Sequence, residues 1–363
     1  MVYILTFAIS VWLLWLGDKT KGAVHSVFII IGLILPILIA GLRDTTIGTD
    51  TGLYPTDVFE FCLSTKSFVL AIASYIGVEP GYVALAWIST QLSNSFNFFL
   101  SFTHAIIICT LLLAYRQFGV NVALAFLFFC LIYFSTSMNA TRQFLAMPYC
   151  LLGFAKFIHK CNKIAFIAFL LAFLFHRSSL FFLLVVALYC LCERKFMVMR
   201  KRKIFVLLTI AVITVLTTFA KLLELAIAIG LAKMEYMERY GDSEMYGSGI
   251  PLSLFALTIF NFIMCMRITN KLTITPYILF TRYVMLISVL LCFAGMISTF
   301  ATRIDHYFIM MGIVCVTYIL QLRRYQHKWT FIGFYFIYWF MVVVVANLGE
   351  TYPYQSKILN SLF

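Results

Sequence analysis

Long apolar runs constrain this 363-residue chain more than any other feature of its sequence. Residues 204–219, 277–300 and 329–346 are apolar on every side, whereas the strands of a membrane barrel alternate apolar and polar positions. Hydrophobic residues make up 63% of the chain, and only lipid can cover that much apolar surface. The sequence therefore predicts an all-α, polytopic helical membrane protein.

The apolar runs predict about twelve transmembrane helices, each of which needs roughly 17 to 25 residues to cross fully. The runs are residues 1–16, 24–42, 98–115, 122–137, 142–158, 164–175, 178–192, 204–219, 251–266, 277–300, 304–320 and 329–346. The run at 164–175 has room for little more than half a bilayer. We treat residues 1–363 as a single integral membrane domain.

Basic residues sort strongly between the two faces of this predicted bundle. Alternating the loops places most of the 27 lysines and arginines on one face, with only two of the 14 acids, Asp18 and Glu193. Because basic loops stay cytoplasmic, both termini and the segments 43–97 and 220–249 are expected on the outer face. These two segments are too polar to cross and are expected to form re-entrant or amphipathic helices. The sorting also explains the net charge of +13, so no nucleic-acid partner is implied.

The most informative polar stretch is residues 41–54, between two apolar runs. It holds Arg43, Asp44, Asp50 and Tyr54 among glycines, in a chain of which only 11% of the residues are charged. Charged groups at a membrane surface are costly unless they bind something or take part in a reaction. This loop is therefore the first candidate for an active site.

Further polar groups are expected on the same outer face, mostly at the ends of apolar runs. They are Glu79 and Tyr82, Arg142 and Gln143, His176 and Arg177, Arg303, and Tyr352 and Tyr354. The ten cysteines include no CxxC pair and the six histidines no i, i+4 pair, so neither a disulfide framework nor a metal site is indicated.

Each of these groups also has a structural interpretation. The arginines can anchor helix ends in the membrane interface. Asp50 can cap a helix that begins at Thr51. Glu79 can mark a turn before Pro80, and His176 can be a structural histidine at a helix end.

Six patches follow one another along the chain, at residues 41–54, 79–82, 141–146, 174–179, 303–308 and 352–354. Their order resembles the EpsG-like branch of the Wzy oligosaccharide polymerases. The resemblance implies a glycosyltransferase of the bacterial inner membrane that polymerises undecaprenyl-pyrophosphate-linked repeat units of O-antigen, capsule or exopolysaccharide on the periplasmic face. The implied partners are the lipid-linked oligosaccharide donor and acceptor, membrane lipid and a chain-length regulator protein, and both termini would be periplasmic.

This chemistry needs fixed cations for the pyrophosphate leaving group and a base for the acceptor hydroxyl. Arginine supplies the charge without a metal or a cofactor. We assign Arg142 and Arg303 to the pyrophosphate, with Arg43 in support, and leave Asp50, Glu79 and His176 open as the catalytic base. Further substrate contacts are expected from Asp44, Gln143 and Arg177, and from tyrosines along the sugar path, Tyr54, Tyr82, Tyr352 and Tyr354.

Two other functions compete with this interpretation. A flippase or other secondary transporter of lipid-linked oligosaccharides should carry inverted repeats and ionisable groups near the bilayer midplane, but the sequence has no internal repeat. A membrane O-acetyltransferase acting on the same glycans should carry a deeply placed histidine, whereas His176 is expected near the outer face.

Overall fold

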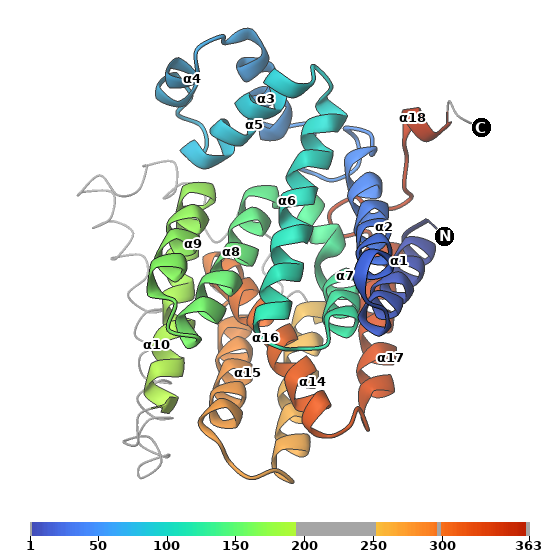
Figure 1. The fold of residues 1–363 in the computed structure, drawn as a ribbon, viewed down its shortest axis with the longest axis vertical. Helices are drawn as coiled ribbons and strands as arrows, with labels where there is room; N and C mark the ends of the chain where they lie inside the picture. Colours follow the sequence, from blue (N-terminus) through green and yellow to red (C-terminus); the bar gives the residue numbers. More distant parts are fainter. Residues whose placement is uncertain (1, 194–251, 296–298, 361–363) are drawn as a thin grey trace. The chain divides into compact units, whose positions relative to one another are not determined.

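The computed structural model describes residues 2–193, 252–295 and 299–360, and every regular element in them is a helix (Figure 1). This confirms the all-α class. The chain divides into two compact units, Met1–Leu180 with Leu320–Phe363, and Phe181–Ile319. The prediction of a single integral membrane domain remains a prediction.

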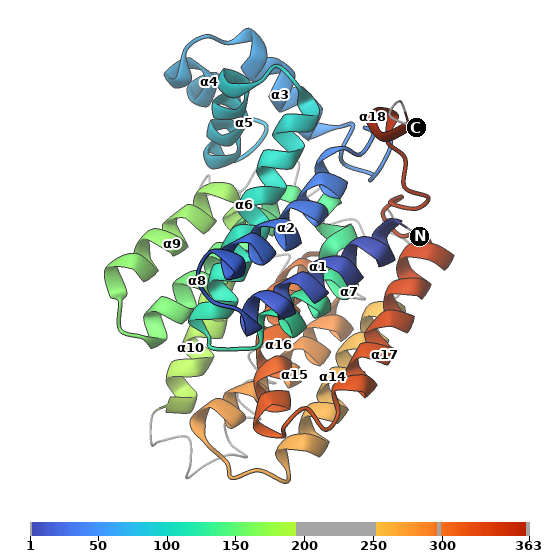
Figure 2. The ribbon, with the colours of Figure 1, turned by 45° about the vertical axis from the view of Figure 1, so that its right-hand side comes forward.

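The first unit is built on apolar helices, most of them long. They are α1 (Val2–Lys19), α2 (Gly22–Gly41), α6 (Phe96–Gln117), α7 (Val122–Asn139), α8 (Thr141–Ile158), α9 (Asn162–Phe175) and α17 (Lys328–Trp339), which continues into the π-helix η2 (Phe340–Val345). Helix α1 packs on α2 and α7, and α8 packs on α9 and α6 (Figure 2). A short helix, α18 (Lys357–Asn360), follows near the end of the chain.

The predicted outer segment 43–97 contains three short helices, α3 (Tyr54–Ser64), α4 (Phe68–Ser74) and α5 (Pro80–Leu92). They lie together at one end of the first unit (Figures 1 and 2), and α5 contacts α3, α4, α6 and the neighbouring α9. The segment is therefore helical and too interrupted to cross a membrane as one span. The turns that lead into α3 and α5 carry four of the polar side chains singled out from the sequence: Arg43, Asp44, Asp50 and Glu79.

The second unit contains α10 (Phe182–Glu193), α14 (Leu252–Thr269), α15 (Pro276–Ala294) and most of α16 (Thr299–Leu322). Helix α10 and helix α14 both pack on α15. A 3-10 turn, η1 (Arg177–Phe181), joins α9 to α10 and interrupts the run that was predicted as one span at residues 178–192. The predicted helices at residues 204–219 and 220–249 lie outside the described residues.

Eight described helices are long and apolar enough to cross a membrane, which confirms a multi-pass membrane protein. They are α1, α2, α6, α7, α14, α15, α16 and α17 with η2. Helix α9 is apolar but has only 14 residues, in keeping with the short run seen in the sequence. The total of about twelve spans, the inner membrane and the periplasmic termini remain predictions.

The predicted runs 277–300 and 304–320 leave a break beside Arg303, and this position of the break is wrong. Helix α15 ends at Ala294, with Gly295 at its C-cap, and α16 has already begun at Thr299. Residues 299–305 contain neither glycine nor proline, so nothing in them interrupts a helix, whereas Gly295 stands where the chain leaves α15. Arg303 therefore lies within α16.

Candidate active site

Glu79 is the centre of a polar cluster in the first unit. It occupies the N-cap position of α5, and Pro80 begins the helix. A Cβ on Gly81 would lie 2.6 Å from the backbone oxygen of Leu174, so only glycine permits α5 to approach the end of α9 this closely. The sequence Glu-Pro-Gly thus brings the Glu79 side chain to His176, which follows α9 directly.

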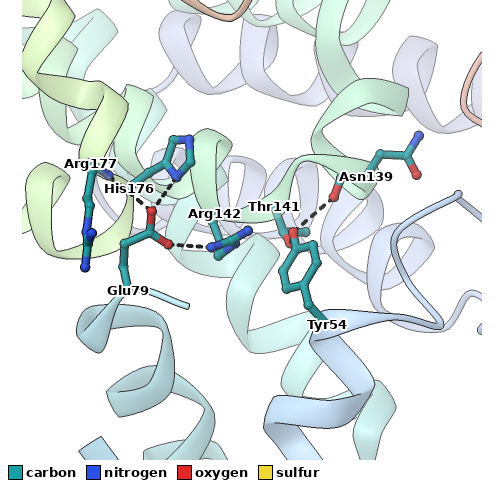
Figure 3. Close-up of polar contacts among 7 residues, drawn as sticks. All are labelled: Tyr54, Glu79, Asn139, Thr141, Arg142, His176 and Arg177. Atoms are coloured by element: carbon teal, nitrogen blue, oxygen red, sulfur yellow. Dashed lines mark hydrogen bonds and ion pairs between the residues drawn. The ribbon is translucent and has the colours of Figure 1, made fainter. Parts of the chain in front are cut away.

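Three groups from two other segments hold the Glu79 carboxylate (Figure 3). The Nδ1–H of His176 donates to Oε1 at 2.8 Å, and the guanidinium NH1 of Arg142 donates to Oε2 at 2.6 Å. The backbone N–H of Arg177 adds a third bond to Oε1 at 3.3 Å. Both carboxylate oxygens are therefore engaged, in a side chain that is 7% exposed.

These partners determine the charge of the carboxylate. Burial alone would raise the pKa of Glu79, but the hydrogen bond from His176 and the electrostatic interactions with His176 and Arg142 lower it to about 2. Glu79 is therefore ionised at neutral pH. A carboxylate this weakly basic is a poor acceptor for a substrate proton and a good fixed anion for Arg142 and for His176 when its ring takes a proton.

Arg142 is also held on its other side, by Tyr54. The guanidinium carbon lies 4.5 Å from the centre of the Tyr54 ring, within the range of a cation–π interaction. The Tyr54 hydroxyl donates to the backbone oxygen of Asn139 at 3.2 Å and lies 2.7 Å from the Thr141 hydroxyl. Tyr82 packs beside Tyr54, with ring centres 5.8 Å apart. One quarter of the Arg142 side chain stays exposed, so a ligand can reach it.

The structure places the three candidate bases differently. Glu79 and His176 are in direct contact, and the His176 side chain is 14% exposed. Asp50 is partly exposed in the turn before α3, where its charge acts on Tyr54. Because α3 begins at Tyr54 with Leu53 at its N-cap, the alternative that Asp50 caps a helix beginning at Thr51 is wrong. Pro55 at the start of α3 is the helix-start signal that the sequence does contain.

Arg43 and Asp44 are engaged in contacts within the first unit. Arg43 is only 1% exposed and donates to backbone and hydroxyl oxygens, among them the backbone oxygen of Met138 at 3.0 Å. Asp44 accepts a hydrogen bond from the backbone N–H of Lys357 at 2.8 Å, and its own backbone N–H donates to the oxygen of Gln355 at 3.1 Å. Both residues thus stabilise the loop at 43–53.

The remaining candidates in the first unit lie on three segments. Gln143 is buried on α8, while the Arg177 side chain is exposed beside the Glu79 cluster. Tyr354 donates to the backbone oxygen of Ile39 at 3.0 Å, and the backbone N–H of Tyr352 donates to the Asn347 side chain at 3.0 Å. Tyr354 thus holds the chain end against α2, and Tyr352 stabilises a turn within the C-terminal segment.

Arg303 belongs to the second unit, so its predicted part in pyrophosphate binding remains a prediction. Two residues further along α16, Asp305 is fully buried and accepts a hydrogen bond from the Ser288 hydroxyl at 2.5 Å. Among the residues that the structure describes, no three His, Cys, Asp or Glu side chains gather in a group that could hold a metal ion.

Asn139, the last residue of α7, is a structural residue outside the predicted site residues. Its side-chain amide donates to the backbone oxygen of Gly349 at 2.9 Å and faces Gly48, whose φ is +92°. A Cβ on Gly48 would lie 2.3 Å from the Asn139 amide oxygen. The backbone N–H of Gly48 donates to the oxygen of Glu350 at 2.9 Å. The loop at 43–53 and the C-terminal segment therefore meet at the end of α7, and glycine at position 48 was the available signal.

The fold and the cluster define a class: an all-helical, multi-pass membrane protein with a carboxylate, a histidine and an arginine joined where three segments meet. Residues 26–356 match the model of the EpsG family, and because the match covers most of the chain, the chain belongs to that family. Membership indicates a membrane protein of the polysaccharide-polymerase type, acting on lipid-linked saccharides. Comparison with curated proteins finds no match, nor does comparison with solved structures.

Proposed function

We propose that this protein is a glycosyltransferase that polymerises undecaprenyl-pyrophosphate-linked oligosaccharide repeat units on the periplasmic face of the bacterial inner membrane. The observation that supports this most is the joining of His176 and Arg142 on one ionised carboxylate, Glu79. The reaction needs a proton acceptor and a cation for phosphate in the same place. The cluster offers both without a metal or a cofactor.

His176 is the base in this proposal. With Nδ1–H donating to Glu79, proton transfer to the ring runs through Nε2. Glu79 orients the imidazole and stabilises the imidazolium that forms when the ring takes a proton, as a buried carboxylate does in other acid–histidine pairs. Glu79 is thus a positioning residue and His176 the catalytic one. Asp50 stays the second candidate for the base, since it lies near Tyr54 at the same site.

Arg142 binds the pyrophosphate of the donor lipid. Its guanidinium is planar and carries N–H groups on two edges, so it can hold Glu79 through NH1 and still grip phosphate oxygens. The Tyr54 ring fixes the plane of that guanidinium. The exposed guanidinium of Arg177 is a second cation beside the cluster, and Arg303 remains a candidate from the second unit.

The reaction balances with these groups alone. The acceptor hydroxyl oxygen forms a bond to the anomeric carbon of the growing glycan, and the bond from that carbon to the pyrophosphate oxygen breaks. His176 takes the hydroxyl proton, while Arg142 stabilises the charge on the departing lipid pyrophosphate. The products are a glycan longer by one repeat unit and a free lipid pyrophosphate.

The test is extension of a lipid-linked repeat unit by purified protein. Wild-type protein, reconstituted with undecaprenyl pyrophosphate that carries one repeat unit, should produce a ladder of lengthening glycans on a gel. Repeat units that cross the membrane without lengthening would instead indicate the alternative function, a flippase. The Arg142→Lys variant should lose the ladder, because an ammonium does not reproduce the planar grip of a guanidinium on phosphate.

Arg116→Lys is the matched control. Arg116 is exposed on α6 and, on the predicted topology, faces the cytoplasm. Its replacement should leave the ladder unchanged. A wild-type ladder from Arg142→Lys protein of normal stability would contradict the role of Arg142 in the reaction.

A further inference from the structure

Arg43 is a buried cation with an unusual set of partners. It is 1% exposed, and among the described residues no carboxylate forms an ion pair with it. NH1 donates to the backbone oxygen of Ala40, NH2 to that of Met138 at 3.0 Å, and both Nε and NH2 lie 3.4 Å from the Thr51 hydroxyl. Burial lowers the pKa of Arg43 to about 10, so the guanidinium is still charged at neutral pH.

Keeping a charge buried without a countercharge is costly, since the group loses its hydration. The hydrogen bonds to three oxygen atoms offset part of that cost. They also occupy all three guanidinium nitrogens with protein acceptors. This geometry argues against the direct contact with pyrophosphate that the sequence suggested for Arg43.

The partners of Arg43 lead directly to the candidate active site. Thr51 stands three residues before Tyr54, and the Thr56 hydroxyl on the first turn of α3 donates back to the Thr51 backbone oxygen at 3.0 Å. Met138 precedes Asn139, whose backbone oxygen accepts the Tyr54 hydroxyl. Arg43 therefore joins the segment that carries Tyr54 to the segment that carries Arg142.

We infer that Arg43 is a positioning residue, which sets the Tyr54 ring against the Arg142 guanidinium by holding Thr51 and Met138 together. The effect of Arg43 on the rate of chain extension rests on the proposed function. Its effect on the packing of the segments that contain Thr51 and Met138 does not. Lysine cannot replace it, because one ammonium on a flexible stem does not span the three acceptors. Thr51 is the partner to vary, because it meets the guanidinium through its side-chain hydroxyl, whereas Ala40 and Met138 contribute backbone oxygens.

The first test compares four variants in the extension assay. Arg43→Lys and Thr51→Val should lower kcat on the order of tenfold to a hundredfold, while KM for the lipid-linked unit changes by less than about twofold. Thr51→Ser restores the hydroxyl and should keep wild-type kcat, as should the control Arg116→Lys. A rise in KM at unchanged kcat in Arg43→Lys would mean that Arg43 binds substrate directly, and would overturn the inference.

The second test does not depend on activity. Hydrogen exchange followed by mass spectrometry should show faster exchange at residues 51–56 and 138–144 in Arg43→Lys and Thr51→Val than in the wild type. Thr51→Ser and Arg116→Lys should match the wild type in both segments. Unchanged exchange in Arg43→Lys would overturn the inference. A wild-type protein that makes no ladder would overturn the proposed function alone, and the exchange result would still decide the role of Arg43.

Discussion

Replacing Glu79 with glutamine removes the one anion that joins His176 and Arg142, and the effect on stability should depend on pH. The folded protein lowers the pKa of this carboxyl from 4.5 to about 2. One pKa unit corresponds to about 1.4 kcal/mol, so ionised Glu79 contributes about 3 kcal/mol to folding at neutral pH. The side chain is only 7% exposed, so solvent screens little of this contribution.

The pH range in which this contribution is lost follows from the direction of the pKa shift. Because the folded pKa lies below the unfolded one, the contribution is complete above pH 4.5 and is lost as the pH falls towards 2. At pH 3 only about 1 kcal/mol should remain. The difference in unfolding free energy between wild type and Glu79→Gln should therefore shrink by about 2 kcal/mol between pH 7 and pH 3.

Denaturant unfolding of the purified protein in detergent, at several pH values, measures this difference. Glu60→Gln is the matched control, because Glu60 is exposed on α3 in the same unit. That variant should stay close to the wild type at every pH. A Glu79→Gln deficit of equal size at pH 7 and pH 3 would mean that the lost interaction does not involve the ionised carboxylate, against this prediction.

Three further results should follow from the same geometry. Tyr54→Phe keeps the ring over Arg142 and should keep most of the extension rate, whereas Tyr54→Leu loses the cation–π contact and should be slower, measured on the same gels. Gly81→Ala should lower both the melting temperature and the extension rate, because its Cβ would meet the end of α9. The control Gly333→Ala has open space at that Cβ, so its melting temperature should be unchanged or higher. A single cysteine at the exposed position Ser64 should react with an impermeant reagent in intact spheroplasts, and protection until the membrane is opened would contradict the predicted topology.

The sequence predicted the helical class and most helix positions, because helices that cross lipid must be apolar on every side. The prediction was weaker at helix ends. Asp50 looked like a cap for α3, but Pro55 at the first turn determines where that helix begins. The break predicted between residues 300 and 304 falls inside α16, and residues 299–305 contain no helix-breaking residue.

For the candidate site, the sequence indicated which residues are important but not which of them would pair. Glu79, Arg142 and His176 stood out in the sequence because charged and titratable groups are rare in this chain. Their pairing joins positions separated by 63 and 97 residues, and no local pattern specifies which helix ends will meet. Nor does a local pattern say that Arg43 turns inward to Thr51 and Met138, since burial depends on the whole packed unit.

In the proposed reaction, His176 takes the acceptor proton at a site organised by Glu79. The most direct measurement is the single-turnover rate of chain extension by His176→Gln, with the lipid-linked unit bound to saturation. A general base contributes about 10² to 10⁴ in rate, so we expect a loss of that size at near wild-type stability. His159→Gln, at an exposed histidine on the predicted cytoplasmic side, should extend at the wild-type rate. Extension by His176→Gln as fast as by His159→Gln would contradict the role of His176 as the base.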